Sequence, residues 1–179
     1  MDLVEKALRI MLVAHGQQKR KTDGSLYVIH PMMVAAKLAK LEFPDEVVAA
    51  AMIHDVLEDT DYPEQKLRQE LGDKVVDIIL PLSEDKSLEW EDRKQKYIEA
   101  VKNASPETKA VSIADKIHNL ENIIVTHQTM GADIWTKFNR GKDKKMWFEQ
   151  EMLKAFKSSW HHPMIAEYEK LIEQVEKLD

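Results

Sequence analysis

Residues 45–60 read Asp-Glu-Val-Val-Ala-Ala-Ala-Met-Ile-His-Asp-Val-Leu-Glu-Asp-Thr. From Asp45 to Leu57 this stretch is apolar nearly all round, which is typical of a helix that is buried on every side. A buried helix needs other elements packed around it, so the stretch predicts the centre of the fold. It ends in ionisable groups, which a buried helix end does not ordinarily contain.

The rest of the chain also shows apolar residues at helical spacing almost throughout. Ser105-Pro106 has the form of an N-cap followed by proline at the first helical position. Further helices are expected over residues 3–12, 31–38, 63–71, 73–82, 106–124, 144–158 and 163–178. No segment alternates as a strand does. We therefore expect an all-α fold, an irregular bundle of roughly eight to ten helices in which residues 1–179 form one domain.

The composition narrows the class of protein. The net charge of −6 argues against binding to a nucleic-acid polymer, because phosphate backbones favour basic surfaces. The longest strongly apolar stretch, Val47 to Ile53, is far shorter than a membrane span, and the N-terminus does not resemble a signal peptide. With no cysteine in the chain, disulfides and thiolate ligands are excluded. We expect a cytoplasmic protein without a membrane partner.

The end of the central helix carries His54, Asp55, Glu58 and Asp59. Residues four apart lie on one helical face, so we expect His54 above Glu58 and Asp55 above Asp59. Burying these groups without partners costs several kcal/mol, about 2–7 for each uncompensated polar group. A bound divalent cation would remove that cost. The alternative is an exposed, acidic helix terminus, which the helix dipole disfavours.

Three other segments place polar residues where they can join this group. Asp115 and Asn119 are four apart on the 106–124 helix, and His30 lies just before a helix start. We interpret His15 as structural, because it lies at the end of the first helix. Two imidazoles and two carboxylates make a ligand set that suits Mn²⁺, Fe²⁺ or Zn²⁺. The predicted metal ligands are His30, His54, Asp55 and Asp115.

A metal with open positions activates water and polarises a phosphoryl oxygen. Glu58 and Asp59, close to the ligands, are suited to orient and deprotonate that water. The basic cluster Lys19-Arg20-Lys21 supplies groups that neutralise phosphate oxygens. The residues thus indicate a phosphohydrolase acting on a phosphorylated small molecule.

These motifs resemble the HD superfamily, which is named for an adjacent His-Asp pair, here His54-Asp55. The match to the hydrolase domain of RelA/SpoT-type proteins and to stand-alone small alarmone hydrolases is more specific, and it covers about residues 1 to 125. The matching residues, in chain order, are Ala14-His15, Gln17, Arg20-Lys21, Tyr27 to Pro31, His54-Asp55, Glu58-Asp59-Thr60, Asp85 to Leu88, Arg93-Lys94, Ala114-Asp115 and His118-Asn119-Leu120.

The resemblance implies an HD-domain fold with Mn²⁺ on the four predicted ligands. It implies Glu58 and Asp59 as the catalytic pair, and substrate contacts from Arg20, Lys21, Asn119 and Lys86. The implied reaction is hydrolysis of the stringent-response alarmone (p)ppGpp to GDP or GTP and pyrophosphate.

Glu121 stands where members of this family commonly carry arginine near the substrate. A carboxylate facing the cleft would repel a polyphosphate, which keeps other nucleotides open as substrates: the 2′-phosphate of NADPH, an adenosine alarmone or a nucleoside monophosphate. A non-catalytic nucleotide-binding module is a further alternative. The sequence leaves open a monomer or a homodimer, and it assigns no role to the basic run from Arg140 to Lys145.

Overall fold

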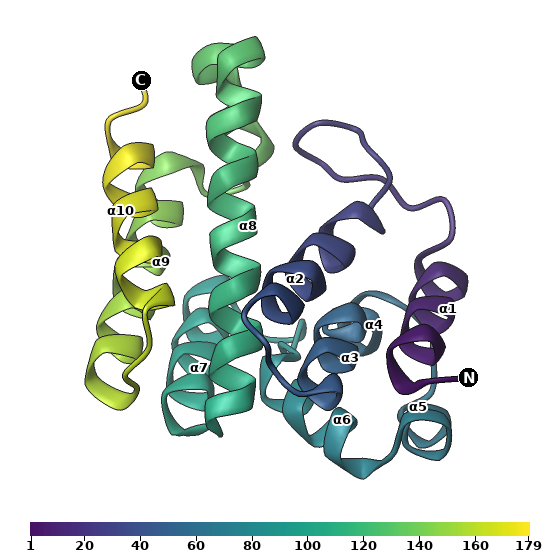
Figure 1. The fold of residues 1–179 in the computed structure, drawn as a ribbon. Helices are drawn as coiled ribbons and strands as arrows, with labels where there is room; N and C mark the ends of the chain where they lie inside the picture. The colour runs from purple at the N-terminus through teal and green to yellow at the C-terminus, as the bar shows by residue number, and fades with distance from the viewer.

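The computed structural model describes all 179 residues, which form ten α-helices and two short 3₁₀ helices around one core (Figure 1). No strand is present apart from one isolated antiparallel bridge between Lys19 and Leu26. The expected all-α class and the expected number of helices are confirmed. No helix combines the length and apolar character that a membrane crossing requires.

The predicted central helix is α3 (Asp45–Ile53), in which every residue from Val47 to Ile53 except Met52 is buried. It packs against α1 (Leu3–His15), α2 (Ile29–Lys40) and α6 (Asp73–Ile79). Three consecutive alanines, Ala49 to Ala51, are fully buried. Small side chains at the contact shorten the distance between helix axes, so α3 can touch three helices at once.

Helix α8 (Pro106–Met130) runs through the middle of the molecule, and the remaining helices lie on either side of it (Figure 1). Its start is the predicted one, because the Ser105 side chain accepts a hydrogen bond from the Thr108 amide. On one side α8 contacts α2, α3 and α6, and on the other side it contacts α10 (Met164–Glu176) and α7 (Trp90–Asn103). The remaining elements are α4 (Val56–Asp59), α5 (Glu64–Leu71), the 3₁₀ helices Leu80–Leu82 (η1) and Gly131–Lys137 (η2), and α9 (Gly141–Ser159).

The central helix is shorter than expected, since α3 ends at Ile53 and not at Leu57. His54 and Asp55 form a turn, with Asp55 at φ −99° and ψ −2°, before the short α4. Successive residues of a regular helix point about 100° apart, so two neighbours do not face the same site. The turn allows the side chains of both residues to face one group of ligands.

The apolar spacing of the sequence does not predict helix α7. Most of its side chains are charged or polar, and only Tyr97, Ile98 and Val101 are buried. It packs mainly on α9, and Phe148 of α9 lies beside the Tyr97 ring. Packing against another part of the chain therefore decides this helix, while its own periodicity is weak.

The segment between α1 and α2, residues 16–28, folds back on itself as a small hairpin-like loop. The Arg20 amide donates to the Ser25 carbonyl, and the Tyr27 amide donates to the Gln18 carbonyl. The turn uses Gly24 at φ +71°, a conformation that glycine adopts without strain. This geometry places the basic cluster Lys19-Arg20-Lys21 beside the start of α2.

Candidate metal centre and nucleotide cavity

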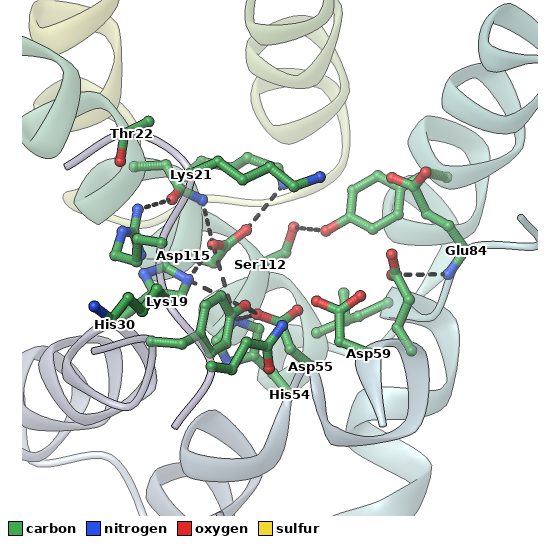
Figure 2. A pocket seen from close by; sticks show the side chains of 18 residues that line it. Lys19, Lys21, Thr22, His30, His54, Asp55, Asp59, Glu84, Ser112 and Asp115 are labelled. Carbon is green, nitrogen blue, oxygen red and sulfur yellow. Dashed lines mark hydrogen bonds and ion pairs between the residues drawn. The ribbon is translucent and has the colours of Figure 1, made fainter. Parts of the chain in front are cut away.

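A cavity of about 360 Å³ lies where the 16–28 loop, the start of α2, the turn between α3 and α4, η1 and α8 meet (Figure 2). All ten residues that the sequence singles out as site residues except Lys86 line it. Basic residues of the loop, Lys19 and Lys21, lie on one side of the cavity, and the acidic residues Asp59 and Glu84 lie on the other. One side of the cavity is thus basic and the opposite side is acidic.

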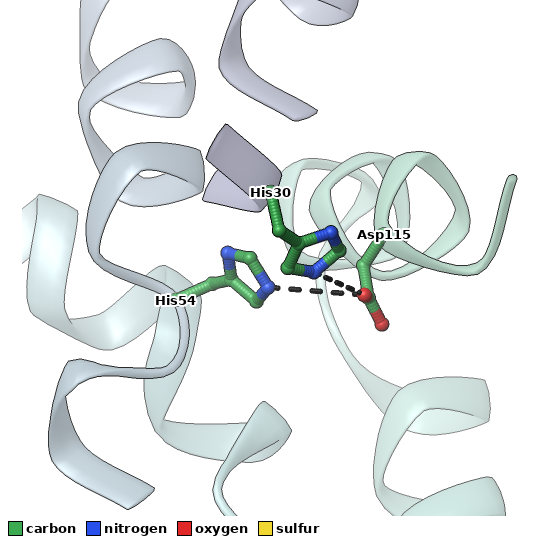
Figure 3. A group of neighbouring side chains, drawn as sticks. All are labelled: His30, His54 and Asp115. Carbon is green, nitrogen blue, oxygen red and sulfur yellow. Dashed lines mark ion pairs between the residues drawn. The ribbon is translucent and has the colours of Figure 1, made fainter. Parts of the chain in front are cut away.

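His30, His54 and Asp115 form a compact group at the bottom of the cavity (Figure 3). One donor atom from each lies within 4.8 Å of the other two. Oδ1 of Asp115 is 2.9 Å from Nε2 of His30 and 3.8 Å from Nε2 of His54. All three residues are buried, and they come from α2, the α3–α4 turn and α8.

The two imidazoles are oriented so that each turns Nε2 toward this group. Nδ1 of His54 is 2.8 Å from the Ala51 carbonyl, which accepts its hydrogen. Nδ1 of His30 is 2.7 Å from Nδ1 of His118, so with hydrogen on His30 the His118 nitrogen accepts. The bond to Ala51 places the hydrogen of His54 on Nδ1, and a hydrogen on Nδ1 of His30 likewise leaves Nε2 of that ring as the ligand atom. Nε2 of His54 is buried and faces Oδ2 of Asp55 at 3.0 Å.

Asp55 lies at the edge of this group. Its Oδ2 is 3.0 Å from Nε2 of His54 and 3.9 Å from Nε2 of His30, and it also accepts a hydrogen bond from the Tyr27 hydroxyl. It is outside the set of mutually close donor atoms that contains Asp115. Three predicted ligands therefore meet at one point, and the fourth lies against both imidazoles.

The electrostatics keep the carboxylates ionised. Burial alone would raise the pKa of Asp115, but Lys116 and the two histidines hold it well below its usual value. Burial also acts to raise the pKa of Asp55, but the neighbouring His54 outweighs burial and lowers this pKa. Burial lowers the pKa of His54, while Asp55 and Asp115 together raise it to about 9. Two ionised carboxylates beside two imidazole nitrogens form a donor set that fits a divalent cation.

Glu58 and Asp59 lie beside this group on α4. Oε2 of Glu58 accepts a hydrogen bond of 3.1 Å from the Glu84 amide. Burial raises the pKa of Glu58, and nearby carboxylates raise it further against the effect of that amide. Lys86 does not line the cavity; its Nζ is 2.6 Å from Oδ1 of Asp59 and donates to the Glu58 carbonyl. In this structure Lys86 thus contacts the acidic pair.

The basic side of the cavity is tied to α8. Nη2 of Arg20 donates to Oδ1 of Asn119 at 2.9 Å, and Nδ2 of Asn119 donates to Oδ1 of Asp115 at 2.5 Å. Nε of Arg20 is buried without a partner. Lys19 and Lys21 line the same cavity. Three cationic groups therefore stand around one end of the cavity, where they suit an anionic ligand.

Two features that the sequence left open lie away from the cavity. Glu121 is two positions from Asn119 on α8, which turns its side chain toward the opposite face, where Lys37 and Glu167 are its charged neighbours. In the Arg140–Lys145 run, Arg140 and Lys144 approach Glu91 at 3.7 and 3.2 Å. No residue of this run lines the cavity.

The structure adds several residues that the sequence reasoning does not assign to the site. They are Tyr27 and His118, which hold predicted ligands, and Glu84, Tyr97, Ser112 and Lys116, which line the cavity. A lysine inside a run of apolar helix positions is a signal for Lys116. Nothing in the local sequence indicates Tyr97, because it comes from α7.

Comparison with known proteins agrees with this geometry. Residues 7–143 match the HD domain family. The *Drosophila melanogaster* protein "Guanosine-3′,5′-bis(diphosphate) 3′-pyrophosphohydrolase MESH1" is 33% identical over 138 residues, which make up 75% of each chain. The zebrafish protein of that name is 36% identical over 112 residues, 61% of this chain and 62% of that protein. An *Aquifex aeolicus* pyrophosphohydrolase is 28% identical over 68% of this chain, yet that region is only 18% of the relative.

Two solved structures share the fold. The crystal structure of lmo0812 from *Listeria monocytogenes* has a TM-score of 0.77 and 34% identity, and the match covers 83% of this chain and 99% of that one. A metazoan ortholog of SpoT has a TM-score of 0.83 at 24% identity and covers 97% of this chain and 96% of its own. The fold and the site place the chain in the class of all-helical proteins with a buried group of histidine and aspartate side chains that could hold a metal ion. Within that class, the chain belongs to the HD domain family.

Proposed function

We propose that this protein is a metal-dependent phosphohydrolase that acts on (p)ppGpp and releases pyrophosphate from its 3′ position. With ppGpp and water as reactants, the products are GDP and pyrophosphate. The relatives named above carry this activity in their names, and the metazoan SpoT ortholog is described as hydrolysing ppGpp. The observation that carries the proposal is the joining of a buried His and Asp group to a cationic loop in one cavity.

We propose His30, His54, Asp55 and Asp115 as the ligands of a divalent metal, Mn²⁺ in preference to Fe²⁺ or Zn²⁺. The approach of both Nε2 atoms to Oδ1 of Asp115 and the hydrogen bonds at both Nδ1 atoms support this assignment. Mn²⁺ follows from the resemblance to the alarmone hydrolases, while the nitrogen and oxygen donors suit all three ions. A divalent cation bound there lowers the pKa of a bound water and polarises a phosphoryl oxygen.

Glu58 and Asp59 are proposed to orient the attacking water and accept its proton. Burial raises the pKa of Glu58, and a carboxylate with a raised pKa is a stronger base. Lys86, 2.6 Å from Asp59, is proposed to contact the substrate by moving from this ion pair to a phosphate oxygen. Its side chain is half exposed, which leaves room for that movement.

Arg20 and Lys21 are proposed to bind the phosphate groups. Asn119 supports this role, because its side chain holds the Arg20 guanidinium toward the cavity. The charge polarity of the cavity supports an orientation in which the anionic groups meet the loop and the water meets the acidic side. Arg20, Lys21 and Asn119 are thus proposed to act together on the phosphate groups of the substrate.

The position of Glu121 removes the objection to a guanosine alarmone as the substrate. Its carboxylate lies among Lys37 and Glu167 and outside the cavity, so it does not oppose a polyphosphate. The phosphatase alternatives, acting on NADPH, an adenosine alarmone or a nucleoside monophosphate, then rest on the shared metal chemistry alone. The occupied catalytic positions argue against a non-catalytic module.

The test is incubation of purified, Mn²⁺-loaded protein with ppGpp, NADPH and nucleoside monophosphates in parallel. We expect GDP and pyrophosphate from ppGpp in equal amounts, and little orthophosphate from the other compounds. Release of orthophosphate from NADPH at a higher kcat/KM would replace the guanosine assignment. A folded, metal-loaded sample that turns over none of them would make the protein a binding module.

Three expectations stay predictions. We propose that residues 1–179 act as one domain, which is supported by a single cluster of 42 buried apolar residues drawn from nearly every element. A cytoplasmic location and a monomeric or homodimeric state are the other two. Of the C-terminal aromatics, Phe148 is buried and Trp135, Trp147 and Trp160 pack partly buried against the core, which favours a core role over an interface.

A further inference from the structure

Lys116 is a charged side chain in the interior of the protein. The residue is 9% exposed, although it lies on α8 next to Asp115. Its Nζ lies 4.8 Å from the centre of the Tyr97 ring and 5.2 Å from the centre of the Phe148 ring. Aromatic faces attract a cation that has lost its water, so α7 and α9 together form a cage for the ammonium group.

Inside the cage the ammonium group of Lys116 contacts Asp115, the residue before it in the chain. Nζ of Lys116 is 2.9 Å from Oδ2 of Asp115, and no other hydrogen-bond acceptor contacts it. Adjacent residues of a regular helix do not face each other. Here the ammonium group lies against the Tyr97 and Phe148 rings and still contacts the residue before it in the chain. The contact therefore depends on packing from two distant helices.

The two oxygens of Asp115 consequently have different surroundings. Oδ2 faces Lys116, while Oδ1 faces His30 at 2.9 Å and accepts the Asn119 amide. Only Oδ1 points toward both imidazole nitrogens. Asp55 lacks such a partner, since its Oδ2 is held by a neutral tyrosine hydroxyl. Lys116 thus holds Oδ2 and restricts rotation of the Asp115 carboxylate.

We infer that Lys116 is a positioning residue, which holds Asp115 as a one-oxygen metal ligand with Oδ1 directed at the histidines. The inference rests on the metal site proposed above and assigns the geometry of that site to a residue that is not one of its ligands. Groups that hold a metal ligand commonly contribute 10- to 100-fold to metal affinity. Removing this ammonium group should therefore weaken metal binding more than folding.

The test compares Lys116→Met with Lys116→Arg. Methionine keeps an unbranched apolar stem in the cage, and arginine keeps a cation that can donate to Oδ2. Mn²⁺ binding to the metal-free protein is measured by the electron paramagnetic resonance signal of free Mn²⁺, with no nucleotide present. Lys102→Met, at an exposed position on α7, is the matched control.

We expect Lys116→Met to bind Mn²⁺ about tenfold or more weakly, and Lys116→Arg and Lys102→Met to stay within about threefold of the original protein. Saturating Mn²⁺ should restore kcat of Lys116→Met with little change in KM for ppGpp. A lysine with a purely structural role would lower the melting temperature and leave Mn²⁺ affinity unchanged. A folded Lys116→Met protein with unchanged Mn²⁺ affinity would overturn the inference.

Phe148→Leu examines the same point if Lys116→Met does not fold. It keeps both charged groups and removes one wall of the cage, so Mn²⁺ affinity should fall, and an unchanged affinity would overturn the inference. The proposed function fails in a different way. A folded original protein that binds no Mn²⁺ contradicts the metal site, whereas normal binding by both the original and the variant contradicts only the role of Lys116.

Discussion

The side-chain amide of Asn119 donates a hydrogen bond of 2.5 Å to Oδ1 of Asp115. The carbonyl oxygen of the same side chain accepts a hydrogen bond from Arg20 at 2.9 Å. One neutral side chain therefore connects the proposed metal ligand to the proposed phosphate-binding arginine. The distance between the cation site and the anion site is set by α8 and not by the loop alone.

Asn119→Ala should raise KM for ppGpp by about tenfold, because Arg20 loses the acceptor that holds it and a hydrogen bond to a charged group contributes about 1.5–3 kcal/mol. The effect on kcat should be smaller, since Asp115 keeps Lys116 and His30. Steady-state kinetics measure both constants. Asn103→Ala, on the surface of α7, is the control. Equal KM values for the two variants would contradict the role of Asn119.

Asp59→Asn and Glu58→Gln should each lower kcat by about 10²- to 10⁴-fold, the range typical of a lost general base. Mn²⁺ affinity should stay within about threefold, because neither side chain belongs to the ligand group. Single-turnover hydrolysis and Mn²⁺ titration measure the two effects. Asp61→Asn changes an exposed neighbour outside the cavity and should leave both unchanged. Stoichiometric loss of metal in Asp59→Asn would make Asp59 a ligand.

Mn²⁺ binding should release about one proton per ion near pH 7, because Asp55 and Asp115, acting against burial, raise the pKa of His54 to about 9 and the bound ion replaces that proton. Calorimetry in buffers of different ionisation enthalpy measures the release. Affinity should increase as pH rises toward 9. In the metal-free protein the pH dependence of stability runs the other way. The raised pKa of His54 stabilises the fold below 6.5, the ordinary pKa of histidine, and this contribution is lost as pH rises through about 9.

Asn122→Ala should loosen the 16–28 loop. Oδ1 of Asn122 accepts from the Thr22 hydroxyl at 2.7 Å, and its Nδ2 donates to Oδ2 of Asp23 at 2.9 Å. Loss of both bonds should raise KM about threefold with kcat nearly unchanged, at about 0.5–1.5 kcal/mol for each hydrogen bond. Hydrogen exchange should become faster at the amides of Arg20 and Tyr27, which the loop protects. Unchanged exchange at both amides would show that other contacts hold the loop.

Glu121→Gln should leave KM for ppGpp within about twofold, because the side chain faces Lys37 and Glu167 and does not line the cavity. The same steady-state assay measures it. A large decrease in KM would show that Glu121 repels the substrate and would reopen the choice of nucleotide.

The sequence alone predicts the helical class, the central position of residues 47–53 and most of the residues around the cavity. It could do so because apolar spacing reports burial along a single helix, and because ionisable groups at the end of a buried helix require partners. The starts of α8 at Ser105 and of α5 after Pro63 were also readable, since capping preferences are local.

The way in which those residues come together is visible only in the folded chain. The break after Ile53, the capture of Lys116 by Tyr97 and Phe148, and the outward position of Glu121 all depend on contacts between segments far apart in the chain. Helix α7 is the clearest case, because its few buried residues leave water mainly by packing against α9. Local periodicity records which side chains leave water, but the partner that receives them is set by packing of the whole chain.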